Sequence, residues 1–226
     1  MEKWFEIEHV EDIDSPALLI YPDRVTNNIR LLKKMVAGNT SRLRPHAKTH
    51  KMVEISKMLI DEGIDQFKCS TIAEAEMLAM SNAKDVLLAY QPIGPKVMRW
   101  IKLVMEYPNT HFSCIVDHQS SAETLGKIAN EYALKLNIYF DINVGMNRTG
   151  ASENQIDGLW STLQNYPSLH LEGVHGYDGQ IHDPNQNLRE SESNESYGIL
   201  KNVYHTLQEK LANSLKMVLG GSPSFS

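Results

Sequence analysis

Short apolar runs alternate with longer amphipathic stretches along most of the chain. In the stretch 24–36, Val25, Ile29, Leu32 and Val36 recur at three- and four-residue spacing, which is typical of a helix with one apolar face. The predicted helices are 24–36, 53–62, 72–80, 97–106, 122–133, 153–165 and 196–212. The predicted strands are 17–21, 43–47, 66–70, 85–90, 111–117, 136–143, 170–176 and 216–220.

Strands and helices that alternate in this way predict a parallel sheet covered by helices. An open sheet for a dinucleotide would carry a G-x-G-x-x-G turn after its first strands, and the sequence has none. A (β/α)8 barrel of the TIM type gathers its chemistry at the C-terminal ends of its strands. Polar or glycine-rich tripeptides do follow the predicted strands, and they favour the barrel: His46-Ala47-Lys48, Cys69-Ser70-Thr71, Tyr90-Gln91-Pro92, Asp141-Ile142-Asn143, His175-Gly176-Tyr177 and Gly220-Gly221-Ser222.

The composition is that of an ordinary globular protein, with 42% hydrophobic and 22% charged residues. The net charge is −6 and no basic stripe is present, which argues against nucleic acid and an anionic membrane as partners. No signal peptide or membrane span is apparent. Cys69 and Cys114 each lie in an apolar run, so we expect buried free thiols and a cytoplasmic location.

The segment around Lys48 is the most informative part of the chain. Lys48 follows an apolar run and would point into the mouth of the barrel, where nearby cations can make a lysine amine a competent nucleophile. The alternative is a surface lysine in a basic loop. His46 and His50 could also form a metal-binding pair on a helix, but Pro45 and the strand pattern argue against a helix here.

Three other segments add candidate binding groups. Arg148 lies between two glycines after a strand, so it could pair with a phenolate or a carboxylate, or stand free on a surface turn. Tyr177 could bond a heteroaromatic nitrogen or be satisfied by backbone. The glycines before Ser222 expose backbone N–H groups that could cradle an anion. The polar segment 179–189 is either a solvated connector or a lid over the site.

Together these motifs resemble the alanine-racemase-like (fold type III) enzymes that use pyridoxal 5′-phosphate (PLP), specifically the D-threonine aldolase / D-serine dehydratase branch. The likeness extends from about residue 12 to the last residues. The matching segments are 13–19, Arg44-Pro45-His46-Ala47-Lys48-Thr49-His50-Lys51, Ser70-Thr71-Ile72-Ala73-Glu74-Ala75-Glu76, 145–150, His175-Gly176-Tyr177-Asp178-Gly179 and Gly220-Gly221-Ser222-Pro223.

The resemblance implies a role for each matching residue. Lys48 would hold PLP as a Schiff base, with His46 and Arg148 as the other catalytic residues. The residues implied to bind the cofactor are Lys48, Thr71, Gln91, Arg148, His175, Tyr177, Gly221 and Ser222. Arg148 would lie near the ring oxygen, Tyr177 would meet the pyridine nitrogen, and Gly221 and Ser222 would form part of the phosphate cup.

In the resembled branch a divalent metal (Mn, Mg or Zn) is held by a C-terminal β domain, and the full-length proteins are expected to be homodimers. The sequence ends at the expected phosphate cup. We therefore expect residues 1–25 to carry a strand that joins an absent β domain, and residues 26–226 to form an incomplete PLP-binding barrel. That barrel would lack its last strand, and no metal ligands are expected in this chain.

The resemblance implies a PLP-dependent lyase that acts on small D-configured β-hydroxy amino acids, as an aldolase or as a dehydratase (ammonia-lyase). A racemase of the same fold is an alternative. A non-catalytic PLP-binding protein of PLP homeostasis is another, and the third is a barrel without PLP.

Overall fold

The computed structural model describes residues 4–225, which divide into a unit that ends at Asn39 and a second unit that begins at Thr40. In the first unit, helix α1 (Pro22–Met35) follows the 3-10 turn η1 (Val10–Asp12). Pro22 suits the first turn of a helix because its ring fixes φ and its missing N–H needs no partner there. The ring centroid of Trp4 lies 5.2 Å from that of Tyr21.

Residues 17–21 form no strand in this structure. They are apolar yet mostly exposed, with Leu18 70% accessible, and they have no ladder partner among residues 4–225. A strand needs a neighbour for its backbone N–H and C=O groups. Pairing of this segment with a separate β domain, and the division of the chain at residue 25, therefore stay predictions. Residues 1–3 of the predicted segment 1–25 and residue 226 of the predicted segment 26–226 lie outside the described residues.

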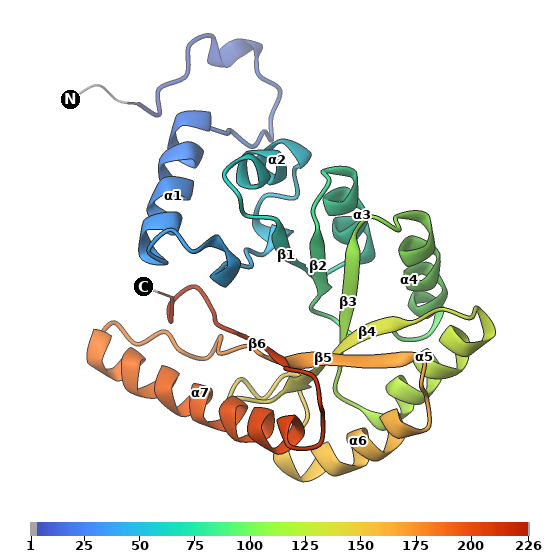
Figure 1. The fold of residues 1–226 in the computed structure, drawn as a ribbon. Coiled ribbons are helices and arrows are strands. Elements are labelled where there is room, and N and C mark those ends of the chain that lie inside the picture. Colours follow the sequence, from blue (N-terminus) through green and yellow to red (C-terminus); the bar gives the residue numbers. More distant parts are fainter. Residues whose placement is uncertain (1–3, 226) are drawn as a thin grey trace. The chain divides into compact units, whose positions relative to one another are not determined.

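The second unit is a curled half-barrel of six parallel strands in the order β1-β2-β3-β4-β5-β6, with helices along its outer side (Figure 1). The strands are β1 (Gln66–Cys69), β2 (Asp85–Leu88), β3 (His111–Val116), β4 (Leu136–Ile142), β5 (Leu169–Gly176) and β6 (Lys216–Leu219). The helices are α2 (Val53–Asp61), α3 (Ile72–Met80), α4 (Pro95–Glu106), α5 (Gln119–Glu131), α6 (Ile156–Gln164) and α7 (Gln186–Gln208). The 3-10 turns are η2 (Thr40–Arg42), η3 (Ala47–Thr49) and η4 (Glu153–Gln155). The barrel fold predicted from the sequence is confirmed.

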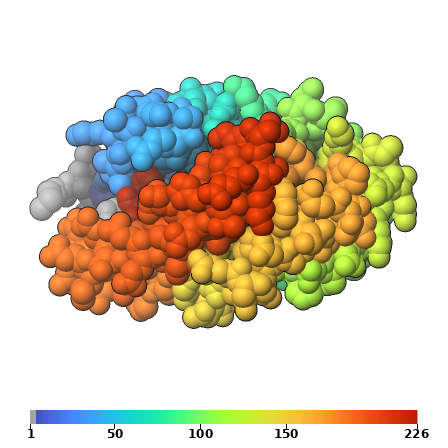
Figure 2. Space-filling model, turned by 60° about the horizontal axis from the view of Figure 1, so that its bottom comes forward, coloured from blue at the N-terminus to red at the C-terminus, as the bar shows by residue number. Residues whose placement is uncertain are grey.

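Alternate residues of each strand face the two sides of the sheet. Leu87, Ile115 and Tyr139 pack together on the inner side, with Val218 against them. Outward-facing residues pack under the helices, as the edge-to-face rings of Trp100 and Phe112 show. Figure 2 shows the orange-to-red surface of α7 along one face of the second unit, beside the yellow of α6.

A bulge interrupts the pairing of β4 with β5. Ile138 pairs with Leu171, but the next residue, Tyr139, pairs with Gly173, which leaves Glu172 as the extra residue. Gly173 also lies against β6, because a Cβ there would stand 2.1 Å from the carbonyl oxygen of Lys216. Only glycine fits this close approach of two backbones.

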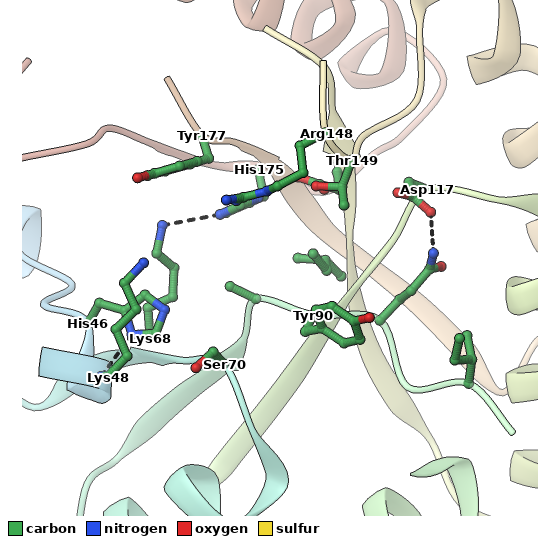
Figure 3. A pocket seen from close by; sticks show the side chains of 15 residues that line it. His46, Lys48, Lys68, Ser70, Tyr90, Asp117, Arg148, Thr149, His175 and Tyr177 are labelled. Carbon is green, nitrogen blue, oxygen red and sulfur yellow. Dashed lines mark hydrogen bonds and ion pairs between the residues drawn. The ribbon is translucent and has the colours of Figure 1, made fainter. Parts of the chain in front are cut away.

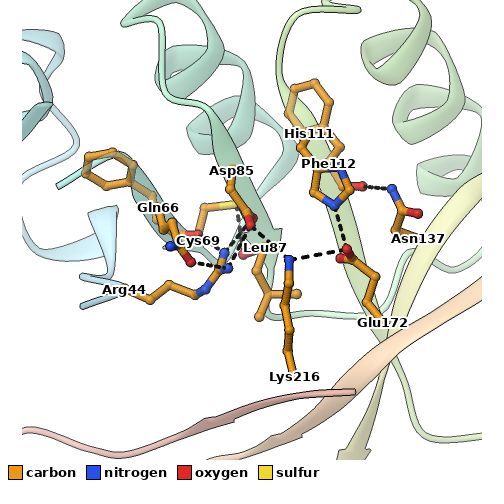
Figure 4. A network of polar contacts seen from close by, with 11 residues as sticks. Arg44, Gln66, Cys69, Asp85, Leu87, His111, Phe112, Asn137, Glu172 and Lys216 are labelled. Carbon is orange, nitrogen blue, oxygen red and sulfur yellow. Dashed lines mark hydrogen bonds and ion pairs between the residues drawn. The ribbon is translucent and has the colours of Figure 1, made fainter. Parts of the chain in front are cut away.

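The end of the half-barrel where the strands begin contains a polar network (Figure 4). Arg44 makes a two-pronged ion pair with Asp85, with N···O distances of 2.7 and 2.9 Å. Lys216 of β6 reaches both Glu172 (3.4 Å) and Asp85 (3.7 Å). His111 contacts the same Glu172 at 2.8 Å, and this hydrogen bond raises the pKa of His111. The network links the first strands to the last.

Two details of the predicted elements are wrong. The predicted strand 43–47 is reduced to a single bridge between His46 and Lys68, because the chain turns into η3 immediately afterwards. The predicted loop 179–189 is shorter, since α7 begins at Gln186 and not at residue 196. The Asn185 side chain caps α7 by accepting a hydrogen bond from the backbone N–H of Asn187. Cys69 and Cys114 are buried free thiols, as predicted.

Candidate active site

A cavity of about 500 Å³ opens at the C-terminal ends of the strands, which is the end where a barrel places its chemistry. Its volume is within the range of small-molecule sites, roughly 300–1,000 Å³. Six of the residues singled out in the sequence line it: His46, Lys48, Gln91, Arg148, His175 and Tyr177. Figure 3 shows five of them, all but Gln91, around one space, with Lys48 from η3, His175 from β5 and Arg148 from the loop after β4.

Lys48 lies in η3, directly after the bridge that joins His46 to β1. His46 caps this turn, because its Nδ1 accepts a hydrogen bond from the backbone N–H of Lys48 at 3.1 Å. Burial, with the nearby charges of Lys48 and Lys68, lowers the pKa of His46 to about 3, so its ring is neutral at pH 7. Lys48 lines the cavity but keeps solvent access, so its amine stands at the mouth.

Arg148 is held over the cavity by a loop that is fastened at both ends. Asn143 accepts hydrogen bonds from the backbone N–H groups of Gly145 and Asn147. The N–H of Gly150 donates to Asp117 at 2.9 Å. Gly150 has φ +98°, and a Cβ there would meet the backbone nitrogen of Asn143 at 2.5 Å, so this turn requires glycine.

Three cationic groups meet at the ring of Tyr177. The Lys48 amine lies 5.5 Å from the ring centroid, the Lys68 amine 5.8 Å and the Arg148 guanidinium carbon 5.2 Å. The face of an aromatic ring attracts cations, but it cannot neutralise three charges. The side of the cavity at Tyr177 is therefore suited to an anionic group of a ligand.

Lys68 was missed by the sequence analysis. It occupies the middle of β1, it is 8% accessible, and its amine contacts Nε2 of His175 at 3.2 Å. Nδ1 of His175 lies 2.6 Å from the Asp141 carboxylate. The available signal was alternation, because Lys68, Asp141 and His175 all occupy inward positions of their strands, β1, β4 and β5.

The hydrogen bonds define how these three groups are protonated. Burial lowers the pKa of His175, so the ring is neutral and carries one N–H. Asp141 can only accept, which places that hydrogen on Nδ1 and leaves Nε2 to accept from Lys68. Burial, and then the charge of Lys48, lowers the pKa of Lys68 to about 8.

The other predicted residues lie around the cavity in different ways. The Gln91 side-chain amide donates to Asp117. Thr71 caps α3 by accepting from the N–H of Glu74, and Ser70, not Thr71, lines the cavity. Gly221 and Ser222 are not among the lining residues, although a Cβ on Gly221 would lie 3.6 Å from the Tyr177 ring.

Asp178 is an acidic residue to which the sequence motifs assigned no role. It is 1% accessible, and its carboxylate oxygens have no hydrogen-bond partner within residues 4–225. A Cβ on Gly221 would lie 2.8 Å from Oδ1 of Asp178. Its negative charge favours the protonated form of Lys68.

Residues 4–225 contain neither a cluster of metal ligands nor a membrane-spanning helix. No group of three or more His, Cys, Asp or Glu side chains is arranged to hold a metal ion. No helix in the same range is long and apolar enough to cross a membrane.

Residues 20–225 match the family model described as "Alanine racemase, N-terminal domain". The chain is 26% identical to the 3-hydroxy-D-aspartate aldolase of Paracoccus denitrificans, covering 75% of this chain and 44% of that protein. It is 25% identical to the D-serine dehydratase of Dictyostelium discoideum, covering 80% of this chain and 50% of that protein. Alanine racemases also match. The chain thus spans about half the length of the curated relatives it matches.

Among solved structures, the D-threonine aldolase of Filomicrobium marinum superposes with a TM-score of 0.84 at 21% identity. The match covers 95% of this chain and 58% of that one. At this identity the likeness supports the shared fold alone.

Proposed function

Because this chain belongs to the alanine racemase N-terminal domain family, we propose that it binds PLP through Lys48 and forms the cofactor-binding part of a lyase. The substrates proposed are D-configured β-hydroxy amino acids. Members of the alanine racemase fold family use PLP. The named relatives include an aldolase and a dehydratase of such amino acids, which supports the class of reaction.

The convergence of Lys48, Lys68 and Arg148 around Tyr177 carries this proposal. PLP has an aldehyde, an anionic ring oxygen and a phosphate, so it needs one amine and several positive or N–H groups. Lys48 offers the amine and Arg148 a guanidinium for the ring oxygen. The backbone around Gly221, next to Tyr177, is our candidate for the phosphate.

When bound, PLP would supply an electron sink for negative charge that develops on the substrate. The protein groups would bind and orient. The Tyr177 hydroxyl would be offered to the pyridine nitrogen, and the fastened loop 143–150 would keep Arg148 in place. Gln91 and Asp117, which are hydrogen-bonded to each other, would border the part of the cavity that receives the substrate.

The first experiment adds PLP to the chain, reduces the mixture with borohydride and maps the label by mass spectrometry. We expect the label on Lys48, and its loss in Lys48→Met. Lys51→Met is the matched control, because Lys51 is in the same segment but is exposed and faces Glu74. Equal binding of PLP by Lys48→Met and the unaltered chain would refute the proposal.

The second experiment uses the complete gene product, with and without Mn²⁺ or Zn²⁺, and offers D-threonine and D-serine separately. Glycine with acetaldehyde would identify an aldolase, and pyruvate with ammonia a dehydratase. Inversion at Cα without cleavage would identify a racemase, which the matching alanine racemases make the second candidate. Bound PLP with none of these products would contradict the lyase proposal and favour a PLP carrier.

A further inference from the structure

The cavity contains two lysine amines, and the function proposed above gives a chemical role to that of Lys48 alone. Lys68 rises from the middle of β1 beside Lys48, with its amine toward His175 (Figure 3). A lysine buried in a barrel interior is costly unless it is paired or its charge is shifted. An acidic partner alone would have stabilised it as a fixed cation.

The partner of Lys68 is a neutral imidazole. His175 accepts from Lys68 through Nε2 while its Nδ1–H is held by Asp141. An ammonium and a neutral amine can both donate a hydrogen to Nε2. Lys68 can therefore gain or lose a proton without losing the contact that fixes its position.

The charges that face Lys68 come from several elements. Lys48 and Arg44 disfavour its protonated form, whereas Asp141 and Asp178 favour it. His46 and His175 are neutral neighbours at pH 7. Burial, together with these opposing charges, lowers the pKa of Lys68 to about 8. This value is close to the pH at which an acid–base group is most effective.

We propose that Lys68 is a second functional amine of the cavity, which donates and accepts protons at the ligand site while the Asp141–His175 pair holds it in position. Its part in turnover rests on the proposed function. Its proton exchange is a property of the chain itself and can be tested without a cofactor.

The test is competitive acetylation of the chain with a trace of acetic anhydride at a series of pH values, followed by peptide mass spectrometry. We expect half-maximal reactivity of Lys68 near pH 8, more than one pH unit below the ordinary lysine value of about 10.4. Lys48→Met should raise this midpoint, because a neighbouring cation is removed. Asp141→Asn should lower it, because a neighbouring anion is removed.

Lys84, which is exposed and paired with Asp65, is the reference lysine in every digest, and Lys57→Arg, at another exposed lysine, is the control substitution. Circular dichroism of each variant shows that it has folded. A Lys68 midpoint near 10.4, or one that does not move in opposite directions in the two variants, would overturn the inference.

A second arm repeats the acetylation at pH 8 with added PLP. We expect both Lys48 and Lys68 to be protected at least fivefold, while Lys84 is unaffected. Protection of Lys48 alone would show that Lys68 does not face the ligand site and would also overturn the inference. If neither lysine is protected, the PLP proposal fails. The inference about Lys68 is then decided by the midpoint of Lys68 and by the shifts of that midpoint in the two variants.

Discussion

His46 shows how a side chain that resembles a catalytic residue can act through the backbone. Its Nδ1 accepts the hydrogen bond that caps η3, and this turn carries the Lys48 amine to the cavity. The ring is neutral because burial lowers its pKa to about 3. Whether His46 also touches a substrate stays a prediction, whereas its contact with the turn is a feature of the fold.

We expect His46→Ala to destabilise the chain by about 1 kcal/mol, the usual cost of a lost cap. His46→Asn should recover most of this loss, because an asparagine oxygen can accept the same N–H. Urea unfolding at pH 7 measures both. Equal losses in the two variants would show that the cap is not the reason for the change.

The pH dependence of His46 follows from the same pKa. The unfolded chain binds a proton to this histidine below about pH 6.5, but the folded chain does so only near pH 3. The contribution of His46 to the free energy of unfolding is therefore fully present above pH 6.5 and is lost as the pH falls toward 3. We expect the His46→Asn chain to lose less stability than the unaltered chain between pH 6.5 and 4, measured by urea unfolding at each pH. A steeper loss in the variant would contradict this.

At the scale of elements, the close approach of β5 and β6 depends on the absence of a side chain at Gly173. A Cβ there would overlap the carbonyl of Lys216 at 2.1 Å and the Tyr139 ring at 2.8 Å. Both strands would have to separate, and β6 pairs only with β5 among the described residues.

Gly173→Ala should therefore destabilise the fold by about 3 kcal/mol, at the upper end of overpacking costs. The matched control is Gly198→Ala in α7, where a Cβ meets nothing within 4 Å. That change should stabilise the chain by about 0.5–1 kcal/mol, because alanine favours a helix more than glycine does. Thermal or urea unfolding compares the two, and a loss in both would show that the steric argument is wrong.

Helices and strands could be predicted from the sequence where the spacing of apolar residues alone distinguished one from the other. The apolar stripes of α1 to α5 and the short apolar runs from β1 onward define those elements without tertiary context. The run 43–47 misled, because a strand requires a partner along its length and only His46 has one. Lys68 was overlooked because a lysine in a strand suggests a solvent-facing side, and only closure of the sheet turns that side inward.

At the scale of the whole molecule, the two ends of the half-barrel interior have different charge patterns. The cavity end gathers three cationic side chains at the Tyr177 ring, where an anionic group of a ligand would meet them. The opposite end balances itself, because Arg44 and Lys216 meet Asp85 and Glu172. The sequence indicated the first end through its motifs, but the second depends on long-range pairs that no local pattern reveals.

Breaking the balanced end should be costly. We expect Arg44→Met to destabilise the fold by about 3–5 kcal/mol, because it leaves the Asp85 carboxylate, whose side chain is only 13% accessible, without its main partner. Lys84→Met breaks an exposed pair with Asp65 and should cost less than about 1 kcal/mol. Denaturant unfolding of both variants tests the difference, and similar costs would show that burial does not decide the strength of these pairs.

The bulge at Glu172 makes the site sensitive to a kind of change that substitutions do not imitate. Were the codon for Glu172 itself lost, Gly173 would follow Leu171 directly, and Asp141 would still stand opposite His175. Were the codon for Val174 lost while the bulge stayed, His175 would stand opposite Phe140 and turn outward beneath the helices. That second deletion would erase the link between Lys68 and Asp141 while leaving the sheet able to form, so any descendant of this gene that has kept the cavity should also have kept the spacing between the bulge and His175.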